Sequence, residues 1–403
     1  LHYTYGRGYY EEYKEQQLLQ DYNIMPVVMN TDTVNYSDII RQKWLDNDFY
    51  GIVYSLSHSI NKSKIIIGGA FNQYLGRHFN KVIWARYASN SEINHKYFDD
   101  KATKNDFNSF CKADILLTTK INLQFDLQYR YVYYKYNGYN YNYTISPEKA
   151  IFHFINPKIG LSYSLNNNSV LFSSYGISNK EPNRDDFIQS LPSNRPKSEK
   201  LNDIEIGFRH KSSNRSITLT LFNMNYKNQL ILTGRINDVG AYIRENIPNS
   251  YRQGIELEYS KKFIKWIVVT GNIALSNNKI KNYTEYIDDY DTYTQKIIKY
   301  NKTDISFSPN LIVYEEIKLI PVNNLTITIN NKYISKQYLD NTSSSSRMIK
   351  PYSVADLIVN YSLKLKNIKE LSFSINLNNI FNTKYVSSGW TYSYFISNTR
   401  IND

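Results

Sequence analysis

The sequence predicts an all-β protein whose strands form one antiparallel, membrane-spanning β-barrel, and three observations support this fold class. Apolar and polar residues alternate over segments of up to about a dozen residues, longer than the strands of soluble proteins usually run. Short and long connections between these segments alternate along the chain. No stretch approaches the roughly 18 consecutive apolar residues of a transmembrane helix, so any membrane crossing has to be made by strands.

The clearest predicted strand covers residues 121–133. Its odd-numbered residues are apolar or aromatic, and its even-numbered residues up to Arg130 are Asn, Gln, Asp or Arg. Because successive side chains of a strand point to opposite faces, one face would meet lipid and the other a wet or plugged lumen. When the same alternation is followed along the whole chain, roughly 15 strands are expected. The other clear segments are residues 159–165, 203–209, 254–259, 325–330, 355–365 and 371–378.

The connections are expected to differ in length at the two rims of the barrel. In outer-membrane barrels the short turns face the periplasm and the long loops face the outside of the cell. A helical turn or two is conceivable only at Tyr10–Gln20. Short turns are expected near residues 166–169, 211–214, 264–265 and 367–369, and long polar loops near residues 20–40, 88–104, 137–150, 178–200, 228–250, 277–303 and 336–351.

Charge and composition narrow the classes of partner and function. The 403 residues carry a formal net charge of +12, with the basic residues scattered along the chain. This favours an anionic lipid or lipopolysaccharide surface, or an anionic ligand, over nucleic acid. The single Cys111 excludes an internal disulfide and a cysteine-based zinc site. No enzyme motif is present, and no metal or cofactor is expected.

Six segments resemble TonB-dependent outer-membrane receptors, particularly those of Bacteroidetes, and together they cover nearly the whole chain. The resemblance implies a barrel of about 22 strands whose lumen holds a plug domain. With the N-terminal plug and the final strand absent from residues 1–403, the barrel is expected to be incomplete. The segments are GRGYYEEYK (6–14), RQKWLDNDFYG (41–51), SNKEPNRDDF (178–187), RINDVGAYIREN (235–246), SYRQGIELE (250–258) and LNNIFNTKYVSSG (377–389).

The same resemblance implies a function in the bacterial outer membrane. Members of the family import scarce nutrients, with ferric siderophores and cobalamin as the leading classes, and the TonB–ExbB–ExbD system supplies the energy through contact with the N-terminal region. Two alternatives remain open, a passive diffusion channel and a surface adhesion barrel. Regulation by iron or cobalamin would favour the importer, constant ion conductance would favour the channel, and binding without uptake would favour the adhesion barrel.

Two glutamates are candidates for contact with the plug. Glu205 and Glu256 lie on the polar side of their predicted strands, and by resemblance they match positions where family members set barrel carboxylates against plug arginines. A charge that faces a filled lumen has to be paired or solvated. The alternative is that both carboxylates are hydrated charges lining the pore.

Ligand contacts are expected in the loops. Glu181 and Arg184 lie in a run of charges with Asp185 and Asp186, which could bind a ligand or form a solvated loop closed by its own ion pairs.

Aromatic and histidine side chains offer further candidates. Trp390 and Tyr392 could stack on a flat ligand, or belong to an aromatic girdle or to packed loops. A haem receptor would need a loop histidine, for which His78 and His95 are candidates, although a surface role fits them better.

Overall fold

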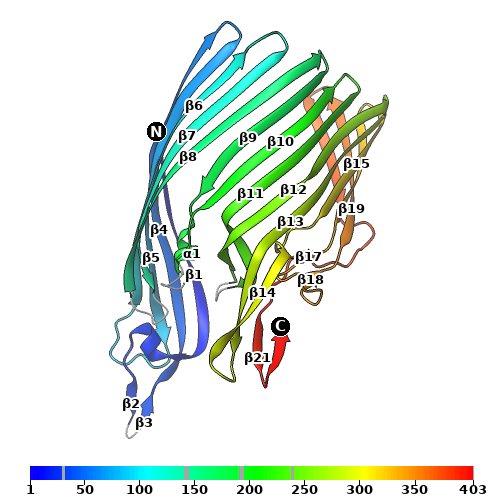
Figure 1. The fold of residues 1–403 in the computed structure, drawn as a ribbon. Coiled ribbons are helices and arrows are strands. Elements are labelled where there is room, and N and C mark those ends of the chain that lie inside the picture. The colour runs from blue at the N-terminus through cyan, green and yellow to red at the C-terminus, as the bar shows by residue number, and fades with distance from the viewer. Residues whose placement is uncertain (30–31, 140–144, 189, 191–194, 237–239, 403) are drawn as a thin grey trace.

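A single sheet of 18 strands dominates the computed structural model. Figure 1 shows this sheet as a wall of tilted strands. The structure describes the chain except residues 30–31, 140–144, 189, 191–194, 237–239 and 403, and the side chains of residues 138–147. Each strand of the main meander pairs antiparallel with the next along the chain. The meander comprises β1 (His2–Leu18), β4 (Tyr36–Ile60), β5 (Ser63–Ala85), β6 (His95–Leu116), β7 (Ile121–Tyr139), β8 (Ile145–Asn166), β9 (Ser169–Lys180), β10 (Glu199–Lys211), β11 (Arg215–Ile236), β12 (Tyr242–Ile264), β13 (Ile267–Asp289), β15 (Leu311–Val322), β16 (Leu325–Ile334), β19 (Tyr352–Leu365) and β20 (Ile368–Leu377).

The remaining strands extend the long-loop side of the wall. β14 (Thr294–Asp304) pairs with the outer half of β13, while β15 pairs with its other half. The hairpin of β21 (Ser393–Ile396) and β22 (Thr399–Asn402) joins the outer end of β13 through a short parallel contact. The pairs β2–β3 (Val27–Met29, Asp32–Val34) and β17–β18 (Gln337–Tyr338, Met348–Ile349) are small separate sheets. The roughly 15 predicted strands therefore correspond to the meander.

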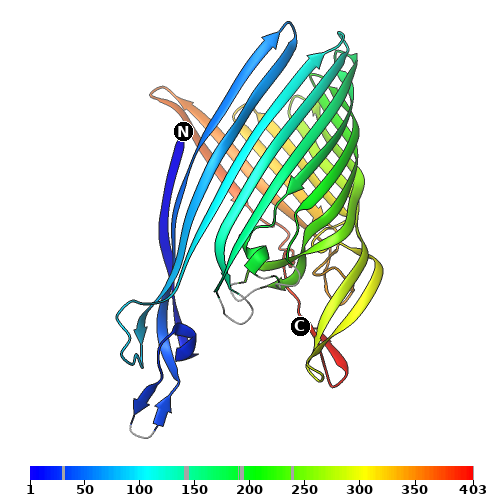
Figure 2. The same ribbon diagram turned by 60° about the vertical axis from the view of Figure 1, so that its left-hand side comes forward.

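The sheet curves into a barrel wall that stays open. The tilted strands surround a central space in both views, with a gap between the edges at β1 and β20 (Figure 2). No residue register joins β1 to β20 in the described part of the chain. The prediction of an all-β, antiparallel and incomplete barrel is therefore confirmed. No helix in the described part is long and apolar enough to cross a membrane.

The two faces of each strand carry different chemistry, as the alternation predicts. On β7, Phe125 and Leu127 are exposed on the outer face, while Arg130 on the other face pairs with Asp106 of β6. The exposed apolar side chains of the wall suit contact with lipid, and the polar face lines the lumen. Ion pairs across neighbouring strands satisfy part of the lumen charge.

The four predicted short turns are confirmed, but several predicted loops turn out to be strands. β8 ends three residues before β9 begins, as β12 does before β13 and β19 before β20, and β10 ends four residues before β11 begins. In contrast, β6, β11, β12, β13 and β14 occupy much of residues 88–104, 228–250 and 277–303. Beyond the membrane the outer face of a strand meets water instead of lipid, so strand pairing continues while the regular apolar alternation is lost. Part of the loops predicted at 20–40, 137–150, 178–200 and 228–250 lies outside the described residues.

Two short helices lie at the long-loop rim. The suggested helical turn at Tyr10–Gln20 is wrong, because β1 continues to Leu18 and only the 3-10 helix Leu19–Tyr22 follows. The α-helix α1 (Arg184–Ile188) lies in the segment predicted as a loop, on the lumen side of the wall (Figure 2). Its Phe187 packs in a buried cluster with Val132, Tyr134, Tyr136 and Phe154 of β7 and β8. Compact packing is thus concentrated at this rim, where the candidate site residues gather.

Candidate functional site

Glu181 anchors the segment between β9 and β10 to the lumen wall. Its carboxylate accepts hydrogen bonds from Arg130 at 2.8 and 2.9 Å and from Lys104 at 3.1 Å. Arg130 also donates to Asp106, at 3.1 and 2.5 Å. Burial opposes ionisation of Glu181, but a backbone N–H and the cations of Arg130 and Lys104 outweigh it, so its pKa lies below the usual range. The anchor is therefore ionised at neutral pH.

Arg184 and Asp186 hold the two sides of α1 to different strands. Arg184 forms an ion pair with Asp100 of β6, which is itself buried, and its guanidinium also lies 3.1 Å from Nδ1 of His78 on β5. Asp186 accepts from Arg244 of β12 at 2.9 and 2.6 Å. Strands far apart around the wall thus converge on one short helix, which covers part of the lumen mouth.

These contacts change the structural interpretation of the charged run at Glu181–Asp186. The alternative of a solvated loop closed by its own ion pairs is wrong, because the anchoring partners lie on the wall strands. Asp185 is exposed, and it forms no ion pair in the described part of the chain. The ligand role of Glu181 and Arg184 stays a prediction.

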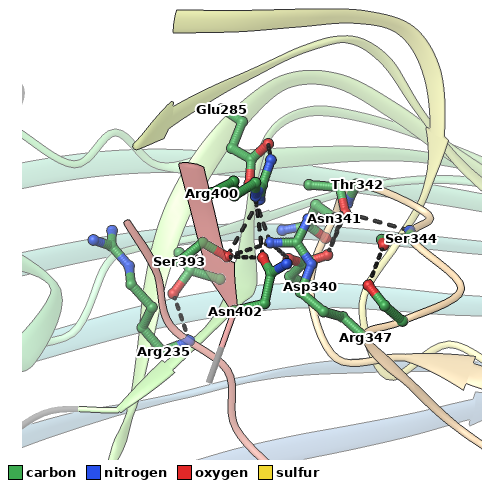
Figure 3. A network of polar contacts seen from close by, with 12 residues as sticks. Arg235, Glu285, Asp340, Asn341, Thr342, Ser344, Arg347, Ser393, Arg400 and Asn402 are labelled. Carbon is green, nitrogen blue, oxygen red and sulfur yellow. Dashed lines mark hydrogen bonds and ion pairs between the residues drawn. The ribbon is translucent and has the colours of Figure 1, made fainter. Parts of the chain in front are cut away.

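A second polar network ties three long-loop elements together, as Figure 3 shows. Glu285 of β13 accepts from Arg400 of β22 at 2.5 and 3.2 Å, and its carboxylate lies 3.4 Å from Arg347. Arg347 also pairs with Asp340 at 3.1 Å and donates to Thr342 at 2.8 Å. Because Arg347 and Asp340 are both buried, loss of Arg347 would leave Asp340 as a buried charge without an ion pair among the described residues. The loop between β17 and β18 is thereby fixed to the β13 and β21–β22 hairpins.

A small pocket of about 80 Å³ lies beside this network. Arg347 and Thr391 line it, and the Nε of Arg347 and the Oγ1 of Thr391 are buried without a hydrogen-bond partner among the described residues. Sites for drug-sized ligands measure roughly 300–1,000 Å³, so in this conformation the pocket suits ordered water or one small polar group. Burial raises the pKa of Asp340 despite the nearby Arg347.

Tyr392 belongs to the same region, whereas Trp390 points to solvent. The hydroxyl of Tyr392 donates to Asp288 at 3.0 Å and lies 2.9 Å from the hydroxyl of Tyr290. Burial, together with these two neighbours, raises the pKa of Tyr392. Tyr392 is therefore part of the packed loops beyond the wall and not of a girdle at the membrane boundary. Trp390 is 52% exposed, so its ring is free to stack on a ligand.

Glu205 and Glu256 lie on the lumen face of β10 and β12. Glu205 is flanked in register by Ser174 of β9 and Phe222 of β11, and its nearest polar contact is the Ser174 hydroxyl at 3.5 Å. Glu256 is exposed on the same face. Within the described residues neither carboxylate has an ion-pair partner. Their contact with a plug stays a prediction.

His78 lies inside a strand and not near a loop, whereas His95 lies at the edge of a loop as expected, and several other site residues were not predicted. His78 lies within β5, and His95 is the first residue of β6, where its ring contacts the Tyr22 carbonyl at 2.9 Å. No group of three His, Cys, Asp or Glu side chains in the described part could hold a metal ion. The unpredicted residues are Lys104, Arg130, Arg244, Glu285, Asp340, Arg347 and Arg400. Arg130 could have been identified from the sequence, because it falls on the lumen face of a predicted strand and a charge there requires a partner.

Comparison with solved structures shows the same fold at low sequence identity. The chain superimposes on the ferric-catecholate import receptor Fiu from E. coli K12 with a TM-score of 0.57 and 16% identity, covering 88% of this chain and 52% of Fiu. It matches the siderophore receptor PiuA from Acinetobacter baumannii with a TM-score of 0.63 and 14% identity, covering 88% and 54%. It matches the copper transporter OprC with a TM-score of 0.67 and 11% identity, covering 91% and 59%. The chain thus spans little more than half of each relative.

A family model gives the assignment. No curated protein sequence matches the chain. The model of the TonB dependent receptor-like β-barrel, however, matches residues 2–380. The match does not distinguish bacterial lineages, so a Bacteroidetes origin stays a prediction. The family consists of receptors, not enzymes, in agreement with the lack of enzyme motifs. The tilted open wall, the polar lumen and this match lead to one conclusion: the chain belongs to the TonB-dependent receptors, as part of a β-barrel of the bacterial outer membrane.

Proposed function

We propose that this chain is the barrel portion of an active importer that takes up a scarce nutrient of the ferric-siderophore class. One observation carries the proposal: Glu205 and Glu256 face the lumen without an ion-pair partner in the described residues, beneath a rim that folds inward. Carboxylates in a filled lumen need cationic partners, which a plug domain of the same protein would supply. Movement of that plug by the TonB–ExbB–ExbD system would open the path.

The ligand would bind in the vestibule between the anchored α1 segment and the Glu285 network. Tyr392 lines the pocket beside the Glu285 network, Trp390 offers an exposed ring two residues before it, and Arg184 places a guanidinium beside the lumen mouth. Glu181 would act indirectly by holding the segment in place. Ferric siderophores carry planar or anionic metal-binding groups, which aromatic and cationic side chains can recognise.

The names of the similar structures support this class of ligand over cobalamin. Fiu and PiuA are described as receptors for ferric catecholates and siderophores, and OprC as a copper transporter. At these identities the likeness concerns the fold, so the cargo has to be found by experiment. The assignment to Bacteroidetes rests on the sequence motifs alone.

The test is uptake by cells that lack other siderophore receptors and express the natural full-length protein. The probe is a ferric catecholate siderophore labelled with radioactive iron. We expect accumulation that requires both TonB and the proton-motive force. Uptake that persists without TonB would replace the importer with a passive channel, and surface binding without accumulation would replace it with an adhesion barrel.

A matched pair of variants tests the vestibule. Trp390→Ala should weaken binding by several-fold, since stacking on an aromatic ring contributes about 1 kcal/mol. Trp84→Ala, an exposed tryptophan of β5 outside the vestibule, should leave binding unchanged. Equal behaviour of the two variants would remove Trp390 from the ligand site and leave the importer itself untouched.

A further inference from the structure

The segment between β20 and β21 is held to the wall directly before Trp390. The hydroxyl of Tyr242 on β12 donates to the carbonyl of Gly389 at 2.9 Å and lies 2.6 Å from the hydroxyl of Ser388. Since the single proton of the phenol goes to the carbonyl, the Ser388 hydroxyl is the donor in the shorter contact. One side chain of the wall therefore fixes the backbone from which the exposed indole of Trp390 projects.

A second contact holds the segment directly after Trp390. The N–H of Thr391 donates to the carbonyl of Gly234 on β11 at 3.0 Å, and Thr391 is itself buried. Gly234 has a φ of 88°, and a Cβ at this position would lie 2.6 Å from the carbonyl oxygen of Leu339, so glycine is the residue that fits here. The exposed indole is thus carried by a backbone that β11 and β12 hold on both sides.

The ring of Tyr242 rests on a fixed part of the connection between β14 and β15. Its centroid is 5.3 Å from that of Phe307, and the two rings meet edge to face at 63°. Phe307 has a φ of 49°, which is unfavourable for a bulky residue and persists only where the surroundings enforce it. Its N–H donates to the Tyr338 carbonyl at 2.9 Å, and the adjacent Ser308 accepts from Arg252 of β12 at 3.0 Å. Phe307 therefore gives the Tyr242 ring a rigid support.

A fixed backbone beneath an exposed ring favours ligand binding. A loop that is already ordered has less conformational freedom to lose when a ligand arrives, so more of the contact energy appears as affinity. Stacking also depends on the angle between the rings, which the direction of the backbone at Trp390 helps to set. The hydroxyl of Tyr242 is occupied by Ser388 and Gly389, so its influence on affinity would pass through the indole.

We propose that Tyr242 is a positioning residue for ligand binding, because it fixes the direction in which Trp390 presents its ring. This inference rests on the proposed function, since it takes Trp390 to be the residue that stacks on the ligand. It adds that binding depends on a phenol of β12, whose hydroxyl holds the backbone before Trp390. The group recognised is a flat ring of the ligand, to which the indole offers one open face.

The first test observes Trp390 without any ligand. The natural full-length receptor is labelled with fluorinated tryptophan and purified in detergent, and Trp390→Phe identifies the Trp390 signal in its fluorine NMR spectrum. In Tyr242→Phe we expect this signal to move toward that of free fluorinated tryptophan, and in Ser388→Ala, which removes one of the two contacts, to move less. The control is Tyr259→Phe, which removes another hydroxyl of β12, hydrogen-bonded to Glu315 at 2.8 Å, and should leave the Trp390 signal unchanged. A Trp390 signal that stays in place in Tyr242→Phe would overturn the proposal.

The second test asks whether Tyr242 acts through Trp390. Binding of a ferric catecholate siderophore is measured for the parent, Tyr242→Phe, Trp390→Ala and the combined variant. We expect Tyr242→Phe to weaken binding about twofold to threefold, less than Trp390→Ala does, because the ring is misplaced but still present. The combined variant should bind like Trp390→Ala alone. Unchanged binding by Tyr242→Phe, or losses that add in the combined variant, would remove the positioning role.

The two tests separate this inference from the proposed function. If the parent does not bind the ferric catecholate, the proposed class of nutrient fails, and the fluorine spectrum still decides whether Tyr242 holds Trp390. If the parent binds and the spectrum of Tyr242→Phe is unchanged, the inference fails and the importer stands. A heat-dependent shift in gel mobility confirms that each variant is folded, so lost binding cannot be ascribed to a lost barrel.

Discussion

The anchoring of α1 through Glu181 gives a prediction that can be worked out from the structure. Glu181→Gln keeps the shape of the side chain but removes the charge that accepts from Arg130 and Lys104. Loss of one partner of a buried ion pair costs about 3–5 kcal/mol when the other charge is left without water. Here Arg130 keeps Asp106, and the Lys104 side chain is 29% exposed. The expected cost is therefore smaller, about 2 kcal/mol.

Amide hydrogen exchange provides the assay. The backbone N–H groups of Asn183 and Asp186 donate to each other's side chains, so they are protected only while the α1 segment is ordered. A loss of about 2 kcal/mol corresponds to roughly thirtyfold faster exchange at these amides, provided that exchange proceeds by local opening. Mass spectrometry of peptides covering residues 183–188 measures this change.

The control for this experiment lies in the same helix. Asp185→Asn removes an exposed charge without an ion pair, so exchange should stay as in the parent protein. If Glu181→Gln leaves the exchange of the segment unchanged, or if Asp185→Asn accelerates it equally, the wall ion pairs do not hold the segment and the reasoning fails.

Three further predictions concern pH, the lumen and packing. Acid should release the α1 segment, because the pKa of Glu181 is lowered in the folded state. The stability that its charge contributes is complete above the pKa of the unfolded state, about 4.5, and is lost as the pH falls through the folded-state pKa. Amide hydrogen exchange, corrected for the intrinsic exchange rates, measures this loss. Combining Glu205→Lys with Glu256→Lys should raise the passive conductance of the full-length receptor in planar bilayers above that of the parent, since like charges would then face the proposed plug arginines. Gly207→Ala should destabilise the barrel by about 1–3 kcal/mol, because a Cβ there would lie 2.3 Å from a phenylalanine ring of β9 and 2.6 Å from a carbonyl of β11, and the temperature at which the folded gel mobility is lost reports this change.

Two of these predictions have a matched control. A Cβ at Gly160, also on a lumen-facing position, would meet its nearest atom at 3.5 Å, so Gly160→Ala should be tolerated. Glu370→Lys reverses an exposed charge on β20 near the short turn and should not change conductance. If a control variant had the same effect as its test variant, the effect would come from any change of charge or size in the barrel and not from the position that the prediction names. Exchange at Asp186 that is independent of pH would remove Glu181 as the titrating anchor.

The membrane part of the fold could be predicted because each of its strands borders two different solvents. Along β7 the side chains from Ile121 to Arg130 point alternately to lipid and to the lumen, so apolar and polar residues alternate in the sequence with the period of a strand. The outer half of β13 buries one face under neighbouring loops, with Tyr283, Glu285, Ile287 and Asp289. Because that face mixes polar and apolar residues, β14 and this half of β13 resemble a loop in the sequence. Pairing there comes from continuation of the ladder and leaves no periodic signal.

The site residues could be predicted only in part. The sequence marked Glu181 and Arg184 as unusual, but their partners lie 51 to 106 positions away along the chain. Such pairings follow from the register of the wall strands, which one sequence does not specify. Likewise Arg347 and Arg400 meet at Glu285 only because three long-loop elements converge. Glu205 and Glu256 were correctly placed on the lumen face because β-strand alternation alone decides that.

The length of β4 has a consequence for what first touches this protein from outside. Its 25 residues extend about 80 Å at 3.3 Å each, and a tilt of about 40° with an apolar band of about 25 Å leaves roughly 35 Å standing clear of the bilayer. The β2–β3 hairpin lies at the far tip in Figure 2, with Met25, Val28 and Met29 exposed. A large particle that approaches from outside would therefore meet this tip before it reaches the vestibule.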